Sequence, residues 1–308
     1  MQLCCKNSGP GDTGNSKMNI LRISLIISLA FSFSIRAESA ARIVTTIHPF
    51  KEILQKVVGD RMEVIQLLPS GASPHTYELR PSEIMKIEQT RAVFYGAANL
   101  DGWVTKMQQA HLISLVDMIP DSLVLHISTS FHFHSEDDRS SVDPHFWTDP
   151  LVVKAILPAI CDTLSVLDPG GKNIYLQNMK AFQIELDKLK QEIALKVQSL
   201  KGTSVFLSLP FFQYYLKRFG FKIAGIIEIN PGTEPTPREL KFFIDLSKKE
   251  NVRAVLAQVQ LSDRPAKLLA EAAHIVLINL DPLGGFPGRE TYSGLLLYDT
   301  HLLVKDLE

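Results

Sequence analysis

The chain has 308 residues, of which 45% are hydrophobic and 21% are charged, and its formal net charge is −1. This composition is typical of a folded protein, and the length is enough for two domains of ordinary size. Because there is no basic excess to attract nucleic acid, we expect no nucleic-acid partner.

Residues 1–40 have the pattern of a secretory signal peptide. Met18 and Arg22 belong to a short positive start, residues 23–35 form an uncharged apolar run, and small residues follow. The run is too short for a comfortable membrane span, so we predict an export signal, with an uncleaved anchor as the alternative. We hypothesise that translation starts at Met18. No cysteine directly follows the run, which argues against a lipid anchor there.

Strand and helix patterns alternate through residues 41–170, the predicted first domain. Strands are predicted at 42–48, 62–68, 92–95 and 112–116, and helices after Pro49, from Pro81 and over 100–109. The longest irregular stretch, 118–149, ends where Asp149 caps and Pro150 starts a helix that reaches about residue 167. Cys161 lies in the apolar pattern of that helix, which indicates a core position.

Residues 172–200 contain no glycine or proline and predict one long helix. Its apolar positions recur at steps of three and four: Tyr175, Met179, Phe182, Leu186, Leu189, Ile193, Val197 and Leu200. At 1.5 Å per residue the helix would be roughly 40 Å long, and one lobe alone is not expected to cover it. We therefore predict that residues 171–201 form a stiff link between two lobes.

The alternation resumes in residues 202–308, the predicted second domain. Strands are predicted at 204–208, 221–229, 252–258 and 274–280, and helices at 210–219, 236–250, 265–273 and 291–307. Thr236 and Glu239 have the spacing of a capping box. The predicted fold class is α/β, with two lobes of mainly parallel sheets flanked by helices, joined by one long rigid helix.

Four polar residues are expected at the carboxyl ends of strands, where ligands gather in open α/β sheets. His48 ends the first strand, His75 lies in the loop after the second, His145 precedes a helix, and Asp281 directly follows the last strand. Imidazole and carboxylate donors suit zinc, or manganese when oxygen predominates, so a bound cation would bridge both lobes.

Each candidate also has a plainer explanation. A lone loop histidine is more often a solvent contact, and an aspartate before a proline can simply form an Asx turn. The irregular stretch holds three further histidines, His126, His132 and His134. It is either a solvated loop or a segment that binds metal ions loosely.

The segments around these residues resemble a known family. Gly-Ala-Ser-Pro-His-Thr-Tyr-Glu at 71–78 and Asp-Pro-His-Phe-Trp-Thr-Asp-Pro at 143–150 are similar to the ligand motifs of the zinc/manganese solute-binding receptors of ABC importers. Glu-Pro-Thr-Pro at 234–237 and Asp-Pro-Leu-Gly at 281–284 resemble that family's helix start and final carboxylate loop. The resemblance implies two α/β lobes on a rigid helix, with His75, His145 and Asp281 as metal ligands.

One position departs from the family pattern. The family's third ligand, a histidine or glutamate, corresponds here to Leu209, which offers no donor to a cation. A water, His48 or a histidine of the irregular stretch would have to complete the site.

The resemblance implies a periplasmic receptor that captures a divalent metal, zinc more than manganese, and passes it to a permease in the inner membrane. It also implies a monomer that is not an enzyme. The alternative that Leu209 keeps open is a metal-free or weakly metal-binding adhesin. A metal-dependent hydrolase is the third reading, but the sequence has no His-Glu-x-x-His motif.

Overall fold

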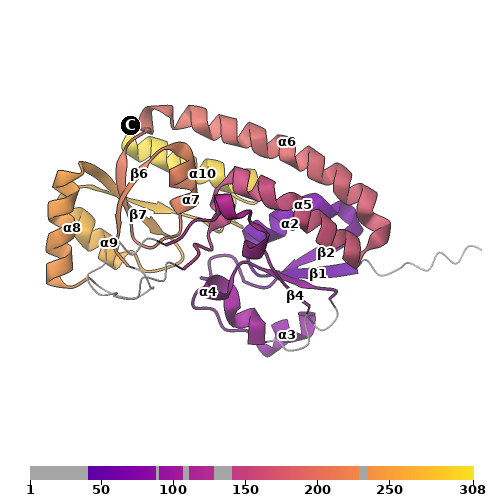
Figure 1. Cartoon of the computed structure of the whole chain (residues 1–308). Helices are drawn as coiled ribbons and strands as arrows, with labels where there is room; N and C mark the ends of the chain where they lie inside the picture. Colours follow the sequence, from indigo (N-terminus) through magenta and orange to yellow (C-terminus); the bar gives the residue numbers. More distant parts are fainter. Residues whose placement is uncertain (1–40, 88–89, 107–110, 128–140, 229–234) are drawn as a thin grey trace, which may run out of the picture. The chain divides into compact units, whose positions relative to one another are not determined.

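The computed structural model describes residues 41–87, 90–106, 111–127, 141–228 and 235–308 (Figure 1). The predicted export signal at 1–40 lies outside the described residues, and so do His132 and His134. The fold below is that of the described residues after position 40.

The first sheet has four parallel strands in the order β2–β1–β3–β4. Its strands are β1 (Ala41–Thr45), β2 (Met62–Gln66), β3 (Val93–Tyr95) and β4 (Leu112–Ser114), and its helices are α2 (His48–Val58), α3 (Pro81–Ile87) and α4 (Ala98–Asp101). Val44 of β1 pairs with Ile65 on one side and Val93 on the other, so apolar β1 is central. Parallel strands of this kind require helices on both faces.

The second sheet repeats this arrangement in the order β6–β5–β7–β8, again parallel. It is built from β5 (Ser204–Leu207), β6 (Lys222–Ile226), β7 (Val252–Gln258), β8 (Val276–Leu280), α7 (Gln213–Phe219), α8 (Pro237–Lys249), α9 (Arg264–Ala273) and α10 (Tyr292–Leu307). The predicted capping box of Thr236 and Glu239 starts α8. Two parallel sheets flanked by helices confirm the predicted fold class.

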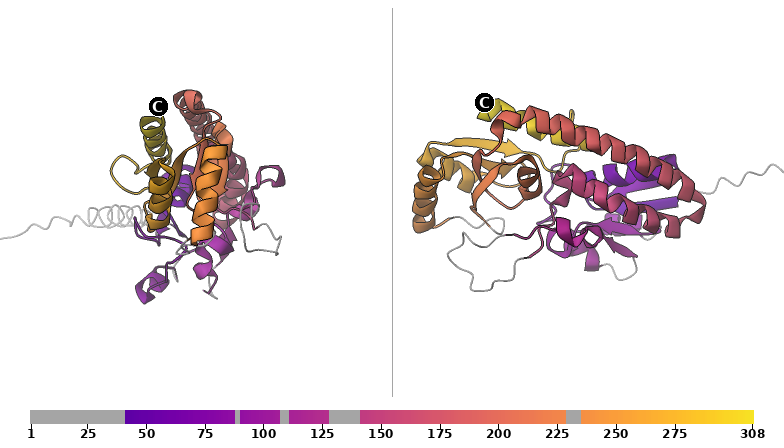
Figure 2. Two further views of the ribbon diagram at one scale, coloured as in Figure 1. Left: turned by 90° about the vertical axis from the view of Figure 1, so that its left-hand side faces the viewer. Right: turned by 45° about the horizontal axis from the view of Figure 1, so that its top comes forward.

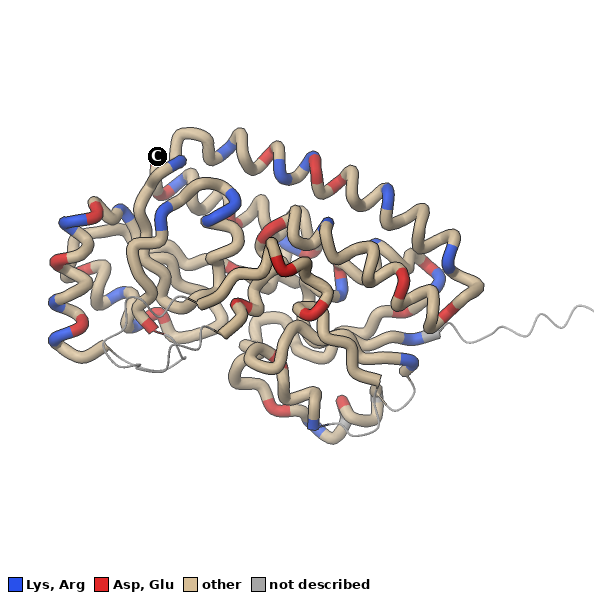
Figure 3. Tube along the Cα trace, viewed as in Figure 1, with Lys and Arg blue, Asp and Glu red and all other residues tan. Residues whose placement is uncertain are grey.

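Two consecutive helices, α5 (Pro150–Leu167) and α6 (Lys172–Lys196), lie between the sheets in the sequence. The predicted apolar stripe of α6 is buried, and α6 packs against α2, α5 and α10, which come from both halves of the chain (Figure 1 and Figure 2). Charges of both signs alternate along α6 (Figure 3). By length and composition α5 would suit a membrane span, but one face of it, which includes Val152, Ile156 and Cys161, is buried in the core.

Several predicted boundaries are wrong. His48 does not end the first strand: β1 stops at Thr45, and His48 opens α2 because Pro49 occupies the first helical turn. The helix predicted from residue 210 begins at Gln213, since Phe212 has a φ of −132°, outside the helical range. The strand predicted from His274 begins at Val276, because His274 caps α9 in a left-handed conformation.

A partly buried ion pair fixes the turn between α5 and α6. Arg61 donates from Nε and Nη2 to the Asp168 carboxylate at 2.7 and 3.0 Å, and the Tyr175 hydroxyl donates to it at 2.6 Å. The hydrogen bond from Arg61, and then that from Tyr175, lowers the pKa of Asp168 from 3.8 to about 2, although burial opposes the shift. The ionised form of Asp168 is therefore preferred by the folded protein.

Asp168→Asn is expected to lower the free energy of unfolding by about 1–2 kcal/mol at pH 7, a value discounted for solvent screening. The discount is needed because the Arg61 side chain is 41% exposed. Because the folded-state pKa is depressed, the stabilisation is complete above pH 3.8 and is lost as the pH falls through about 2. Urea unfolding at pH 7 and pH 3 measures the effect, and the difference from wild type should shrink at the lower pH.

Glu63→Gln is the matched control, because Glu63 pairs with Arg42 at 2.8 Å but both side chains are about half exposed. Glu63→Gln should lower the free energy of unfolding by about 0.5 kcal/mol or less. Equal losses in the two variants would contradict a special role for the Asp168 pair.

Candidate functional site

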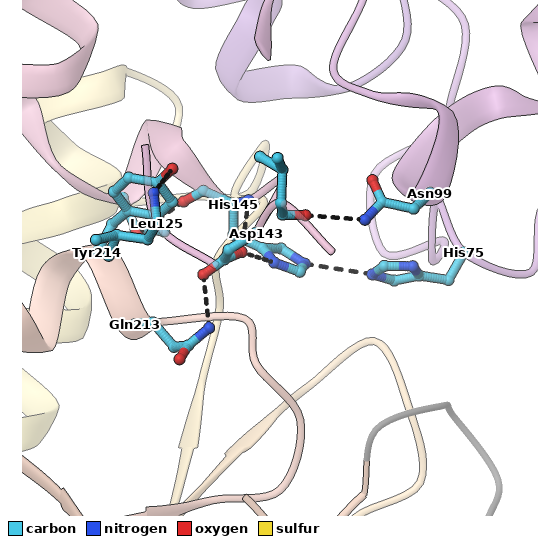
Figure 4. A network of polar contacts seen from close by, with 9 residues as sticks. His75, Asn99, Leu125, Asp143, His145, Gln213 and Tyr214 are labelled. Atoms are coloured by element: carbon cyan, nitrogen blue, oxygen red, sulfur yellow. Dashed lines mark hydrogen bonds and ion pairs between the residues drawn. The ribbon is translucent and has the colours of Figure 1, made fainter. Parts of the chain in front are cut away.

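Two predicted site residues meet in the structure. His75, in the loop after β2, and His145, just before α5, place their Nε2 atoms 3.3 Å apart (Figure 4). His145 is 4% exposed and His75 is partly buried, so water has little access to the contact. The two imidazoles thus form one nitrogen pair from segments that are 70 residues apart in the chain.

The imidazole of His145 is held from behind by a buried carboxylate. Asp143 Oδ1 lies 2.8 Å from His145 Nδ1 and accepts the backbone N–H of the same residue at 2.9 Å. Gln213 Nε2, at the start of α7, donates to the other oxygen of Asp143 at 2.9 Å. When Nδ1 of a histidine donates to a carboxylate, its Nε2 keeps a lone pair for a cation. The network therefore directs this lone pair towards His75.

His75 is kept neutral. Burial, and then the proximity of His145, lowers the pKa of His75 from 6.5 to about 3, while a hydrogen bond to the backbone of Asn99 opposes the shift. A neutral imidazole can act as a donor to a metal, whereas a protonated one cannot.

Asp281 is fully buried directly after β8, and its two oxygens have different surroundings. Oδ1 accepts the backbone N–H groups of Leu283 and Gly284 at 3.1 and 3.0 Å, and also the side-chain amide of Gln260. The Asx turn considered from the sequence is thus present. Oδ2 faces the Nη1 atom of Arg289 at 3.0 Å. One oxygen shapes the loop, and the other is available to an ionic partner.

A second buried acidic side chain, Asp299 of α10, supports the backbone of Asp281. Asp299 Oδ1 accepts the backbone N–H of Asp281 at 2.8 Å. Burial raises the pKa of Asp299 well above its ordinary range, and the charge of Asp281 adds to this shift. Burial thus favours the neutral form of Asp299, although the hydrogen bond from the backbone of Asp281 opposes the shift, and Arg289 lies beside the carboxylate of Asp281.

The three segments that carry the predicted ligands lie together. Trp147, two residues after His145, donates from Nε1 to the carbonyl oxygen of Pro282 at 2.8 Å. A side chain at Gly285 would collide with Ser70, and one at Gly71 would contact Phe286, so the loop after β8 rests on the loop that carries His75. The backbone thus brings the segments of His75, His145 and Asp281 to one place.

Although the backbone segments of the predicted ligands lie together, their side chains do not form a single cluster. Among the described residues, no three His, Cys, Asp or Glu side chains are grouped so that they could hold one metal ion. His48 is occupied at both ring nitrogens, by Gln66 Oε1 at 3.2 Å and the carbonyl oxygen of Glu290 at 2.9 Å. Leu209 is buried in the apolar core, and His126 forms an isolated β-bridge with Val142.

Sequence analysis did not assign the residues that surround these ligands. Asp143 stands two positions before His145, and this spacing brings its carboxylate close to the imidazole ring. This partner of His145 could therefore have been predicted from the sequence. Arg289 reaches Asp281 only because Gly284 and Gly285 adopt positive φ values of 68° and 82° and fold the loop back. No linear spacing predicts that contact.

Comparisons with known proteins agree with this fold. The family model described as zinc-uptake complex component A, periplasmic, matches residues 43–305. The manganese ABC transporter substrate-binding lipoprotein PsaA of Streptococcus anginosus is 26% identical over 241 residues, which cover 76% of this chain and 77% of that protein.

Solved structures extend the likeness to the fold. A crystal structure of ZnuA has a TM-score of 0.74 and 26% identity, and covers 88% of this chain and 100% of its own. The laminin-binding protein Lmb of Streptococcus agalactiae, described as bifunctional with adhesin and metal-transporting activity, has a TM-score of 0.71 and 25% identity, covering 87% and 100%. The chain belongs to the zinc-uptake component A family, whose members are solute-binding receptors for metal transport and not enzymes.

Proposed function

We propose that this protein captures a divalent metal ion, zinc in preference to manganese, and delivers it to an ABC-type permease in the inner membrane. The observation that carries the proposal is the separation of 3.3 Å between the Nε2 atoms of His75 and His145. Two nitrogens bound to one zinc at tetrahedral angles, each about 2.0–2.1 Å from the metal, lie about 3.3 Å apart. The imidazole pair has the spacing of two zinc ligands.

Asp281 is the third ligand in this proposal. Its Oδ2 atom is buried and, among the described groups, accepts no hydrogen bond, although Arg289 lies close to it. The loop that carries Asp281 rests on the segments of both histidines, and for this reason we assign the carboxylate of Asp281 as the third donor. Water takes the position that Leu209 leaves without a donor. His48 is the weaker candidate because both of its ring nitrogens already have partners.

Zinc is preferred over manganese in this proposal because of the donors. Two neutral imidazoles and one carboxylate suit zinc, whereas manganese favours sites in which oxygen donors predominate. Leu209 strengthens this argument, since a glutamate at that position would have added a hard oxygen donor. The named relatives include both a manganese receptor and ZnuA, so the preference rests on the donors of this chain.

The cellular setting completes the proposal. Residues 1–40 direct export to the periplasm, residues 41–170 and 202–308 form the two lobes, and 171–201 form the rigid link. The protein acts as a monomer, binds no nucleic acid and meets its permease at the membrane surface. The long α6 helix, packed against helices of both halves, favours a modest closing motion over a wide hinge.

A second candidate is an adhesin that binds metal weakly or not at all. Two observations favour it: Leu209 supplies no donor, and Arg289 balances the charge of Asp281. Lmb, a structural relative, is described as an adhesin as well as a metal transporter. Elemental analysis of the native protein separates the candidates, because an adhesin without metal would contain less than one zinc or manganese ion per chain after dialysis.

His75→Ala and His145→Ala are each expected to weaken zinc binding by at least about tenfold, on the order of 1.4 kcal/mol, because each removes one nitrogen ligand. Competition titration with a chromophoric chelator measures the affinity. His301→Ala, which removes an exposed imidazole from α10, should leave it unchanged. Wild-type affinity in both site variants would exclude the histidine pair as the metal site.

Asp143→Asn is expected to weaken zinc binding by about 10–100-fold although it removes no ligand, because partners of this kind fix the tautomer and orientation of a ligating histidine. The matched control is Asp245→Asn, since Asp245 is exposed and pairs only loosely with Lys241 at 4.0 Å. Thermal melting of each variant checks that the fold is kept. An affinity within twofold of wild type would show that Asp143 does not position His145.

A further inference from the structure

Arg289 is a positively charged residue that lies against Asp281, one of the proposed ligands. Its Nη1 atom lies 3.0 Å from Asp281 Oδ2, its side chain is 20% exposed, and that of Asp281 is fully buried. The guanidinium also lies over the Tyr298 ring, 4.3 Å from its centroid, and near the Phe286 ring at 5.3 Å. Aromatic faces stabilise a cation at such distances. Arg289 is thus held beside the carboxylate by ring contacts as well as by charge.

The contact between Arg289 and Asp281 is ionic without a well-directed hydrogen bond. Within the described part of the chain, Asp281 Oδ2 and Arg289 Nε are both buried and neither has a hydrogen-bond partner. Arginine–carboxylate pairs are strongest when two parallel N–H···O bonds form, and this pair forms none of that kind. Asp281 Oδ2 therefore has a charge neighbour and a remaining capacity for a cation.

We propose that Arg289 is a specificity-determining residue that balances the charge of Asp281 and so biases the site towards cations that bind imidazole nitrogen. This inference rests on the proposed function. With Arg289 beside it, the carboxylate of Asp281 attracts a cation less strongly, whereas His75 and His145 still supply their two nitrogen donors. A cation that draws most of its affinity from nitrogen donors, such as zinc, loses little affinity through Arg289. A cation that depends on oxygen donors, such as manganese, loses more affinity.

The test compares zinc and manganese affinities of the wild type with those of Arg289→Met and Arg289→Lys. Methionine keeps the volume and removes the charge, while lysine keeps the charge. The backbone bonds that close the loop, from Gly285 N to Arg289 O and from Arg289 N to Phe286 O, involve no side chain and remain in both variants. Arg253→Met removes an exposed arginine from β7 and is the control for net charge.

Arg289→Met is expected to raise manganese affinity about tenfold, because it removes a positive charge next to the proposed carboxylate ligand. The expected size follows from the Coulomb interaction, which shifts the pKa of a carboxyl beside an arginine by roughly 1–3 units. Zinc affinity should rise less, so that the zinc-to-manganese affinity ratio falls at least about threefold. Arg289→Lys and Arg253→Met should keep the wild-type ratio. Competition titrations with each metal alone give both constants.

Two other outcomes overturn the inference in different ways. If the wild type binds zinc through His75 and His145 but Arg289→Met keeps the wild-type ratio, or Arg289→Lys lowers it equally, Arg289 does not set specificity while the proposed function stands. If the wild type binds neither metal, the proposed function and the inference fail together.

Discussion

The site depends on the approach of two imidazole nitrogens to 3.3 Å in a buried environment. Two such nitrogens repel each other when both present lone pairs, and burial also lowers the pKa of His75. The arrangement is favourable when a cation lies between them or when one ring donates a proton to the other. The same contact thus suits either a cation held between the two rings, as proposed, or a hydrogen bond from one ring to the other.

On one side the contact is maintained because the segment of His145 is held by several other elements. The Trp147 indole and the Tyr292 hydroxyl join the segment of His145 to the loop after β8 and to α10, through bonds of 2.8 and 2.7 Å. Gln213 reaches Asp143 from α7, so the orientation of the His145 ring also depends on an element of the second sheet. Such support from distant elements fixes ligand geometry more precisely than loop residues alone can.

Local chemistry made much of the fold and part of the site predictable. The α6 stripe, the Thr236 capping box and Pro150 at a helix start are short-range signals, and the structure contains all three. The meeting of His75 and His145 follows from the rule that ligands gather at the carboxyl ends of parallel strands. The partners of Asp281 were not predictable, because they depend on how a glycine-containing loop folds back and on the buried face of α10.

Arg289 also bears on how a receptor of this kind releases its cargo. A buried carboxylate without a counter-ion is costly, so a site that held Asp281 alone would resist the loss of its cation. In the proposed site, Arg289 at 3.0 Å is the counter-ion of Asp281 when no cation is bound, and the Tyr298 ring keeps it nearby. If Arg289 weakens binding as proposed, the same residue lowers the free-energy cost of release. A receptor must both capture and deliver, and a moderate affinity set by an internal counter-ion suits both steps.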